Sequence, residues 1–315
     1  LVMLNGTPVA NFLDKNVAVN KSLSISGYSL SGVDASNYEL PSFLNLTASI
    51  TAKPLSISGL TLLDKVYDGD LSASVNDSVA VKTGIVSGDQ VSVLSTGTFA
   101  DENVGVDKLV SITNQFLGAD AGNYIISGQT SGLASIYPKA LSVTGITAVD
   151  KVYDGDMTAS LDLSSVVKAG LIPGDEVVLS STGLFSDKNV GESKTVAFSN
   201  AFAGSDVGNY AITGQSLGAA SITRKTLAVS GLKALDKVYD GGLSASVEVS
   251  SAVKDGLVAG DEVKIASTGT FSNPMVGQDK AVVMTNDYSG SDVGNYEISS
   301  QNTGVASILK KVLSI

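Results

Sequence analysis

Short apolar stretches separated by turn-forming residues recur along the whole chain. Typical examples are VSVLS at 91–95 and TVAFS at 195–199, which are bounded by Gly, Asp, Asn and Ser residues. Stretches of this kind that are rich in β-branched residues are typical of β-strands. The best helical candidate is SSVVKAGL at 164–171, where a serine precedes a single predicted turn that ends at Gly170. The pattern therefore predicts an all-β fold.

The pattern repeats every 86 residues along most of the chain. Three motifs share this period: DKVYDG begins at 64, 150 and 236, GD-x-V begins at 88, 174 and 260, and GNY begins at 122, 208 and 294. The copies align without a gap, which predicts three full modules at 54–139, 140–225 and 226–311. Residues 1–53 match the C-terminal part of a preceding module, and residues 312–315 match the start of a further one. A period this long suits a small domain with its own core better than a solenoid repeat.

The junctions between copies indicate how the modules connect. SIYPKALSV at 135–143 and SITRKTLAV at 221–229 pass from one copy to the next without a Gly/Ser linker. In the first of these, Ile136 and Leu141 are expected to enter the cores of successive modules. A short, strand-like connection limits bending between neighbours. We therefore predict small antiparallel β-sandwich-like modules arranged as an extended rod, with β-grasp-like modules carrying one short helix as the alternative.

Aromatic residues are scarce, and most of them occupy equivalent positions in the repeats. An aromatic side chain on an apolar strand pattern is well suited to a core. The predicted structural positions are Tyr67, Tyr153, Tyr239, Tyr124, Tyr210, Tyr296, Phe99, Phe185 and Phe271. In DKVYDG the Asp-Gly pair is a strong turn signal, because Gly accepts positive φ and Asp bonds to its own backbone. We interpret the motif as a strand with a buried tyrosine that ends in a tight turn.

The chain lacks cysteine, histidine and tryptophan, and this limits its chemistry. Without Cys and His it has no thiolate nucleophile, and it lacks the commonest general base and transition-metal ligand. We therefore predict that the protein is not an enzyme and has no catalytic or cofactor-binding residues. The net charge of −11 disfavours nucleic acids and anionic lipid surfaces as partners, and no apolar stretch is long enough for membrane insertion. We expect a monomer whose partners are neighbouring modules of the same chain.

Acidic turn residues give a weak signal for calcium. The YDGD sequences place Asp68 near Asp70 and Asp154 near Asp156, and oxygen ligands of this kind bind calcium in other settings. The third copy has Gly242 in place of the second acid, and no motif of the D-x-D-x-D-G type occurs. Solvated turn acids are the favoured interpretation, and no other metal site is predicted.

An internal Lys–Asn isopeptide crosslink is a second weak signal. Lys65, Lys108 and Asn123 recur at equivalent positions in every full copy. Such a bond would need an apolar pocket and a neighbouring acid in addition to these residues.

The order of motifs in each copy resembles a known type of repeat. KVYDG, followed by GD-x-V and then by GNY near the end of the copy, is similar to the YDG-type and related MBG-type repeats of large secreted bacterial adhesins of the filamentous-haemagglutinin class. The resemblance covers the three full copies and extends to the partial first one. It implies an extracellular, β-rich stalk module at the bacterial cell surface, arrayed to hold an adhesive region away from the cell. It supplies no catalytic residues.

Two hypotheses for function follow from the sequence. The first is a semi-rigid stalk or spacer without catalysis, whose length scales with the number of modules. The alternative is a set of weak glycan- or protein-binding repeats that act by avidity, for which the sequence identifies no ligand. Exposed aromatic residues would discriminate between them, and only Phe43, Tyr137, Phe198 and Tyr28 lie off the repeated positions. That distribution favours the stalk.

Overall fold

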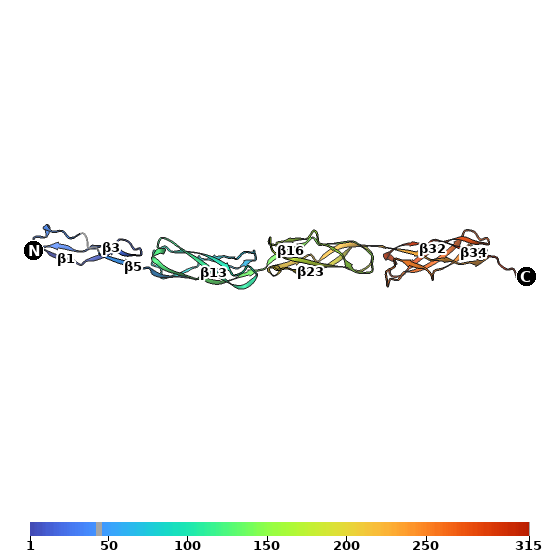
Figure 1. The fold of residues 1–315 in the computed structure, drawn as a ribbon, viewed down its shortest axis with the longest axis horizontal. Helices are drawn as coiled ribbons and strands as arrows, with labels where there is room; N and C mark the ends of the chain where they lie inside the picture. The colour runs from blue at the N-terminus through green and yellow to red at the C-terminus, as the bar shows by residue number, and fades with distance from the viewer. Residues whose placement is uncertain (42–45, 315) are drawn as a thin grey trace. The chain divides into compact units, whose positions relative to one another are not determined.

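The computed structural model describes residues 1–41 and 46–314, which form β-strands linked by turns (Figure 1). The all-β prediction is confirmed, because helical structure in these described ranges is limited to single 3₁₀ turns. The tandem arrangement of similar β modules is confirmed as well. By internal contacts the chain divides into two compact units, one of Leu1–Lys139 with Gly208–Ala211 and the other of Ala140–Val207 with Ile212–Ile315.

The first unit contains a partial module followed by the first full module. The partial module comprises β1 (Met3–Asn5), β2 (Val9–Phe12), β3 (Ala18–Ser26), β4 (Ser29–Ser31), η1 (Ala35–Asn37) and β5 (Thr47–Ile50). The first full module comprises β6 (Lys53–Ser58), β7 (Thr61–Leu62), β8 (Lys65–Val66), β9 (Ser72–Ala73), β10 (Val75–Asn76), β11 (Val81–Thr83), β12 (Ser92–Phe99), β13 (Gly105–Leu117), η2 (Ala121–Asn123), β14 (Tyr124–Gly128) and β15 (Ser131–Tyr137).

The second and third full modules repeat this order of elements. The second comprises β16 (Lys139–Thr144), β17 (Thr147–Ala148), β18 (Lys151–Val152), β19 (Thr158–Ala159), β20 (Leu161–Asp162), β21 (Val167–Ala169), β22 (Val178–Phe185), β23 (Gly191–Ala203), η3 (Val207–Asn209), β24 (Tyr210–Gly214) and β25 (Leu217–Thr223). The third comprises β26 (Lys225–Ser230), β27 (Lys233–Ala234), β28 (Lys237–Val238), β29 (Ser244–Glu248), β30 (Val253–Asp255), β31 (Lys264–Phe271), β32 (Gly277–Ser289), η4 (Val293–Asn295), β33 (Tyr296–Ser300) and β34 (Thr303–Leu309).

The third module shows how two sheets build the fold. One sheet has the strand order β30-β26-β33, and the other has the order β27-β29-β31-β32-β34-β28. The edge strands β27 and β28 of the larger sheet are consecutive in the sequence, so a single chain segment joins both edges and the sheet curls. Two of the pairings, β26 with β33 and β28 with β34, are parallel. The sequence analysis did not anticipate these parallel pairs, because alternation specifies which face of a strand is buried and not which strand lies beside it.

The core of the third module lies between its two sheets. Phe271, Val282 and Ile308 form a buried cluster on the inner face of the larger sheet. Leu227 of β26 belongs to the same buried cluster as Met284 of β32, so the smaller sheet packs over the larger one. The alternating burial along β32, with every second residue inside from Val282 to Met284, is the period-two pattern that the sequence shows.

The helical turn predicted at Ser164–Leu171 is wrong. The segment contains strand β21, which pairs antiparallel with β16 and places Lys168 opposite Val143. The Lys168 ammonium also donates a hydrogen bond to the Val177 carbonyl. Strand pairing satisfies backbone groups that an isolated helical turn leaves unpaired. The β-grasp-like alternative, which depended on this helix, is therefore not the fold. No helix within 1–41 or 46–314 has the length and apolar character that a membrane span needs.

Candidate functional site

The DKVYDG motif forms a turn in each full module that a lysine–aspartate contact closes. In the second module, the Asp150 carboxylate accepts a hydrogen bond from the Ser221 backbone N–H at 2.6 Å, which fixes the start of the motif to β25. The Lys151 ammonium donates to the Asp154 carboxylate at 2.7 Å, and Gly155 adopts a φ of +83° that favours glycine. Four of the six motif residues therefore serve to build the turn within their own module.

The tyrosine of the motif contacts the following module. The Tyr153 ring lies 5.6 Å from the Tyr296 ring, centroid to centroid, at an interplanar angle of 79°. This is the edge-to-face geometry that aromatic pairs prefer. Tyr153 and Tyr296 belong to one buried cluster with Phe185 of the second module and Leu227 of the third. The hydrophobic cores of the second and third modules are therefore continuous.

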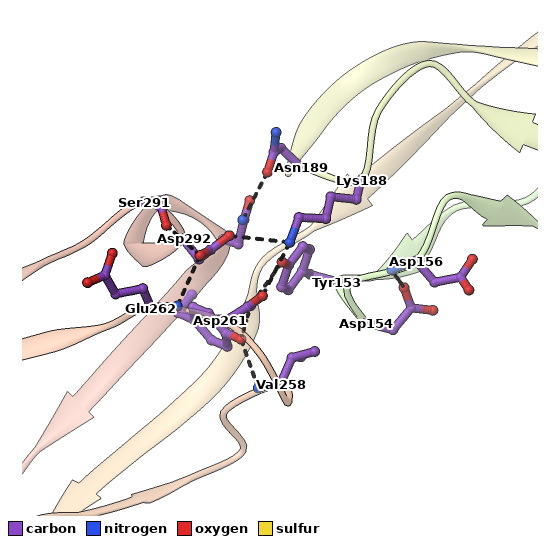
Figure 2. A network of polar contacts seen from close by, with 12 residues as sticks. Tyr153, Asp154, Asp156, Lys188, Asn189, Val258, Asp261, Glu262, Ser291 and Asp292 are labelled. Atoms are coloured by element: carbon purple, nitrogen blue, oxygen red, sulfur yellow. Dashed lines mark hydrogen bonds and ion pairs between the residues drawn. The ribbon is translucent and has the colours of Figure 1, made fainter.

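A buried carboxylate lies beside the two rings (Figure 2). The GD-x-V motif forms a turn in which the Asp261 N–H donates to the Val258 carbonyl. The Asp261 carboxylate, whose side chain is 2% exposed, accepts hydrogen bonds from the Tyr153 hydroxyl at 2.9 Å and from the Tyr296 hydroxyl at 2.5 Å. A carboxylate removed from water to this degree requires such donors and a compensating charge.

Lys188 of the second module supplies that charge. Its ammonium lies 3.3 Å from an Asp261 carboxylate oxygen and 3.4 Å from an Asp292 carboxylate oxygen, and Figure 2 shows it reaching toward both aspartates. Asp292 is held in place because its carboxylate also accepts a hydrogen bond from the Glu262 N–H at 3.0 Å. One cation of the second module therefore bridges two anions of the third.

A buried carboxamide completes the junction. The Asn295 side-chain oxygen accepts a hydrogen bond from the Val190 N–H at 2.9 Å, and its side-chain nitrogen donates to the Asn189 side-chain oxygen at 3.1 Å. Asn295 is 4% exposed although its partners belong to the other module. The junction network, as named here, consists of Tyr153, Lys188, Asn189, Val190, Asp261, Asp292, Asn295 and Tyr296.

The first unit contains an equivalent network between the partial module and the first full module. The Lys15 ammonium lies 2.6 Å from both the Asp89 and the Asp120 carboxylates. The Val17 N–H donates to the Asn123 carboxamide oxygen at 2.9 Å, and the Tyr124 hydroxyl donates to Asp89 at 2.5 Å. The lysine, the asparagine and the GNY tyrosine therefore make equivalent contacts in both units.

The network shifts the pKa values of Tyr153, Lys188, Asp292 and Tyr296. Burial, followed by the hydrogen bond to the Asp261 carboxylate, raises the pKa of Tyr296 to about 12. The pKa of Tyr153 is raised for the same two reasons. Hydrogen bonds with Tyr153 and Asp261 raise the pKa of Lys188, and the Glu262 N–H is the main group that lowers the pKa of Asp292. The ammonium, the carboxylate of Asp292 and both neutral phenols are therefore the forms that the network favours.

The predicted aromatic positions fall into two classes. Eight of the nine are buried, with exposed fractions of 8% or less, and the exception is Tyr239 at 40%. The three Phe residues lie in module cores, whereas the motif tyrosines Tyr67 and Tyr153 pack against Tyr210 and Tyr296. The sequence analysis placed Tyr67 in a strand of its own module. The Tyr67 side chain is buried, and its ring lies 5.5 Å from that of Tyr210, inside the first unit.

The carboxylates that were considered as calcium ligands make hydrogen bonds and ion pairs within the DKVYDG turn. The Asp68 carboxylate bonds to the Lys65 ammonium at 2.7 Å, and the Asp70 carboxylate accepts from the Ser72 N–H. Asp154 and Asp156 make the equivalent contacts in the second module, the latter with Thr158. Over the described residues there is no group of three or more acidic side chains arranged to hold a metal ion.

The residues considered for an isopeptide bond do not meet. Lys65 bonds to Asp68, and the Lys108 ammonium bonds to the Asp101 carboxylate at 2.5 Å. The Asn123 carboxamide instead contacts Val17 of the partial module. The recurrence of this asparagine therefore reflects the junction.

The aromatic residues that do not occupy equivalent positions in the repeats form no exposed aromatic site that recurs from module to module. Tyr137 is 48% exposed, but the equivalent residues of the next two modules are Thr223 and Leu309. Phe198 is buried, and Phe43 lies outside the described residues.

The junction residues that sequence reasoning missed are Lys188, Asp261 and Asn295. GD-x-V and GNY were recognised as repeated motifs but were interpreted as turns. Asn295 and Val190 are 105 residues apart in the chain, and no local pattern reveals such a contact. The available signal was the recurrence of Lys-Asn-Val at 15–17 and 188–190 in a loop that has no apolar strand pattern.

We predict that Asn295→Ala weakens the junction by about 1–3 kcal/mol, because it leaves the partly buried Val190 N–H without its acceptor. The measurement is the free energy of opening at the Val190 amide from native-state hydrogen exchange. Asn302→Ala, at an exposed side chain of the same module, serves as the control. Equal protection of Val190 in both variants would contradict the assignment.

We also predict a pH dependence that comes from Tyr296. Its pKa of about 12 in the folded protein lies above the ordinary value of about 10. The contribution of the neutral phenol to stability is therefore complete below about pH 10 and is lost as the pH rises to about 12. Titration of the ¹³C-labelled tyrosine rings by NMR measures this pKa. Asp261→Asn is expected to lower it while burial keeps it above the ordinary value, and an unchanged pKa in that variant would refute the role of Asp261.

Similarities to solved structures are low, and no curated protein matches the chain significantly. A structure of Drosophila N-cadherin EC1-4 is 6% identical, covers 98% of this chain and 93% of its own, and has a TM-score of 0.30. The Bacillus anthracis TIE protein is 10% identical, with 98% and 58% covered and a TM-score of 0.25. The Escherichia coli adhesin FdeC is 13% identical, with 82% and 98% covered and a TM-score of 0.23. At these TM-scores the likeness carries no inference about function.

The family assignment comes from the sequence itself. The family model described as YDG domain matches residues 51–131, 137–217 and 223–304, and each match contains one DKVYDG, one GD-x-V and one GNY motif. The resemblance to YDG-type repeats is thereby confirmed. The chain belongs to the YDG domain family and carries three of these domains in tandem.

Proposed function

We propose that this chain is a structural spacer of a bacterial cell-surface adhesin, located outside the cell and without catalytic activity. In this role the YDG modules form a semi-rigid, extended segment that projects an adhesive region. The observation that carries the proposal is the junction network, in which buried groups of one module are satisfied by groups of the next. Membership of the YDG domain family supports the assignment to an adhesin-type repeat protein.

The contacts of the junction network resist bending for three separate reasons. The edge-to-face pair of Tyr153 and Tyr296 contributes about 0.5–1.5 kcal/mol beyond its buried area. Separation of the modules would also leave the Asp261 carboxylate without Lys188, and an uncompensated buried charge is strongly destabilising. The carboxamide of Asn295 adds directional hydrogen bonds that fix rotation between the modules. Such a junction transmits orientation from one module to its neighbour.

The avidity alternative has no specific observation in its favour. It would require an exposed site that recurs in every module, and the exposed Tyr137 has no aromatic equivalent at 223 or 309. The net charge of −11 supports the proposal that the segment stays monomeric, because like charge discourages side-by-side association. It also fits the proposal that nucleic acids are not partners.

Small-angle X-ray scattering on the 315-residue chain tests the spacer function. A compact globule of this length would have a radius of gyration of roughly 20 Å. Modules of about 30 Å placed end to end should give more than about 30 Å, and this larger value is the expected result. A value close to the smaller one would mean that modules pack side by side, and the spacer proposal would fail.

A further inference from the structure

The first and the last strand of the third module are both paired along their length with strands of the same module. β26 pairs in parallel with β33 over five registered residue pairs, from Lys225 with Tyr296 to Val229 with Ser300. The last strand, β34, pairs in parallel with β28 and antiparallel with β32. The chain therefore enters and leaves this module through strands that the module itself holds.

The chain enters and leaves the third module at opposite ends. β26 begins beside Tyr296, whose ring contacts Tyr153 of the preceding module. β34 ends at Leu309, whose carbonyl accepts a hydrogen bond from the N–H of Tyr239, the DKVYDG residue equivalent to Tyr153. Figure 1 shows β32 and β34 running along the length of this module. A pull on the two ends of the module is therefore directed along its strands.

Buried side chains also hold the first and last strands. In β26 the exposed fractions of Leu227 and Val229 are 0% and 3%, and in β34 those of Ala306 and Ile308 are 4% and 1%. If either strand slid out of its sheet, these side chains would be carried into water, and the loss of apolar burial would add to the loss of hydrogen bonds. The strands that a pull loads first are therefore anchored in two ways.

The connection between the second and third modules has no slack. β25 ends at Thr223 and β26 begins at Lys225, so that Arg224 alone lies between the two strands. The Arg224 side chain is itself tied to the third module, because its Nε donates a hydrogen bond to the Gly294 carbonyl at 3.2 Å. A force that arrives through the second module therefore reaches β26 directly.

The first full module, which lies in the other compact unit, has the same arrangement. Its first strand β6 pairs in parallel with β14 over five registered pairs, and its last strand β15 pairs in parallel with β8. Leu55 and Ile57 of β6 and Ile136 of β15 are each 1% exposed. The pairing and the buried anchors of the terminal strands thus recur in both units.

We propose that each full module is a mechanical clamp, which resists tension applied to its ends because its first and last strands are loaded in shear. The inference deepens the proposed spacer function and rests on it, since a spacer that projects an adhesive region carries tension along its length. In shear, the hydrogen bonds between two strands must break together, whereas strands that are pulled apart sideways lose one bond at a time. The same bonds therefore withstand a larger force along the strands than across them.

Pulling the third module in two directions tests the clamp. The full chain has no cysteine of its own, so handles can be attached at introduced cysteines. Thr226→Cys combined with Lys310→Cys loads the module along β26, and Thr226→Cys combined with Glu297→Cys pulls registered partners of β26 and β33 apart sideways. All three side chains are exposed, and in both variants the force passes through the third module alone.

Optical tweezers measure the rupture force of each variant at the same loading rate. We expect the force along the strands to be at least twice the force across them. The two variants share one handle site and one fold, so the direction of the load is the difference between them. Equal rupture forces in the two directions would overturn the proposal.

Proline substitution tests whether the parallel pairing is the cause. The Gln301 N–H donates to the Val229 carbonyl of β26. Successive residues of a strand face opposite sides, so the N–H of Ser299 also faces β26, whereas that of Ser300 faces the open edge of the sheet. Ser299→Pro should lower the force along the strands by about a fifth or more, because proline lacks the N–H.

Ser300→Pro is the matched control and should retain the force of the parent. An equal loss of force in both proline variants would contradict the role assigned to the pairing of β26 with β33. If Ser299→Pro fails to fold, the comparison of the two pulling directions in the proline-free chain still decides the proposal.

A failure of the clamp is distinguishable from a failure of the spacer function. An extended radius of gyration together with equal rupture forces would refute the clamp and leave the spacer function standing. A compact radius together with a larger force along the strands would refute the spacer function, and the clamp would then be a property of the module without that role.

Discussion

The Asp261 carboxylate imposes the constraint on which the module junction depends. Its side chain is almost fully removed from water, and its partners are two phenols, which recur in each full copy, and the Lys188 ammonium. Two of the three donors, Tyr153 and Lys188, come from the preceding module. The third module therefore presents a buried anion whose partners it does not itself fully supply. Because the Asp261 carboxylate is desolvated, it needs the partners that the preceding module supplies. A buried charge without partners is far more costly than a neutral contact surface.

This constraint explains why the motifs recur letter for letter. In DKVYDG the first aspartate fixes the motif to β25, the lysine and second aspartate close the turn, and the glycine permits its positive φ. The tyrosine side chain contacts the neighbouring module. GD-x-V supplies the carboxylate, and GNY supplies both the carboxamide and the second ring. The three short motifs of one copy thus supply contact residues at both ends of the module. DKVYDG contacts the following module, and GD-x-V and GNY contact the preceding one.

The sequence predicts the strands, the turns and the buried aromatics, but it does not predict which copy a repeated residue contacts. Alternation along β32 and the Asp-Gly turn are local, so they can be inferred from neighbouring residues alone. Tyr153 illustrates the limit. In a chain of near-identical copies, a contact within one copy and the same contact between adjacent copies leave the same pattern of recurrence. The partner Asn295 was missed for this reason, and β21 was misassigned because its pairing with β16 is a tertiary contact.

The central claim is that the junction network holds the second and third modules in one orientation. Residual dipolar couplings of backbone amides, measured on the weakly aligned chain, test it most directly. Couplings from β22 and β23 and couplings from β31 and β32 should fit a single alignment tensor, with the same magnitude and the same axes. Two tensors of different magnitude would show that the modules reorient independently, and the account of Asp261 and its partners as a stiff joint would be contradicted.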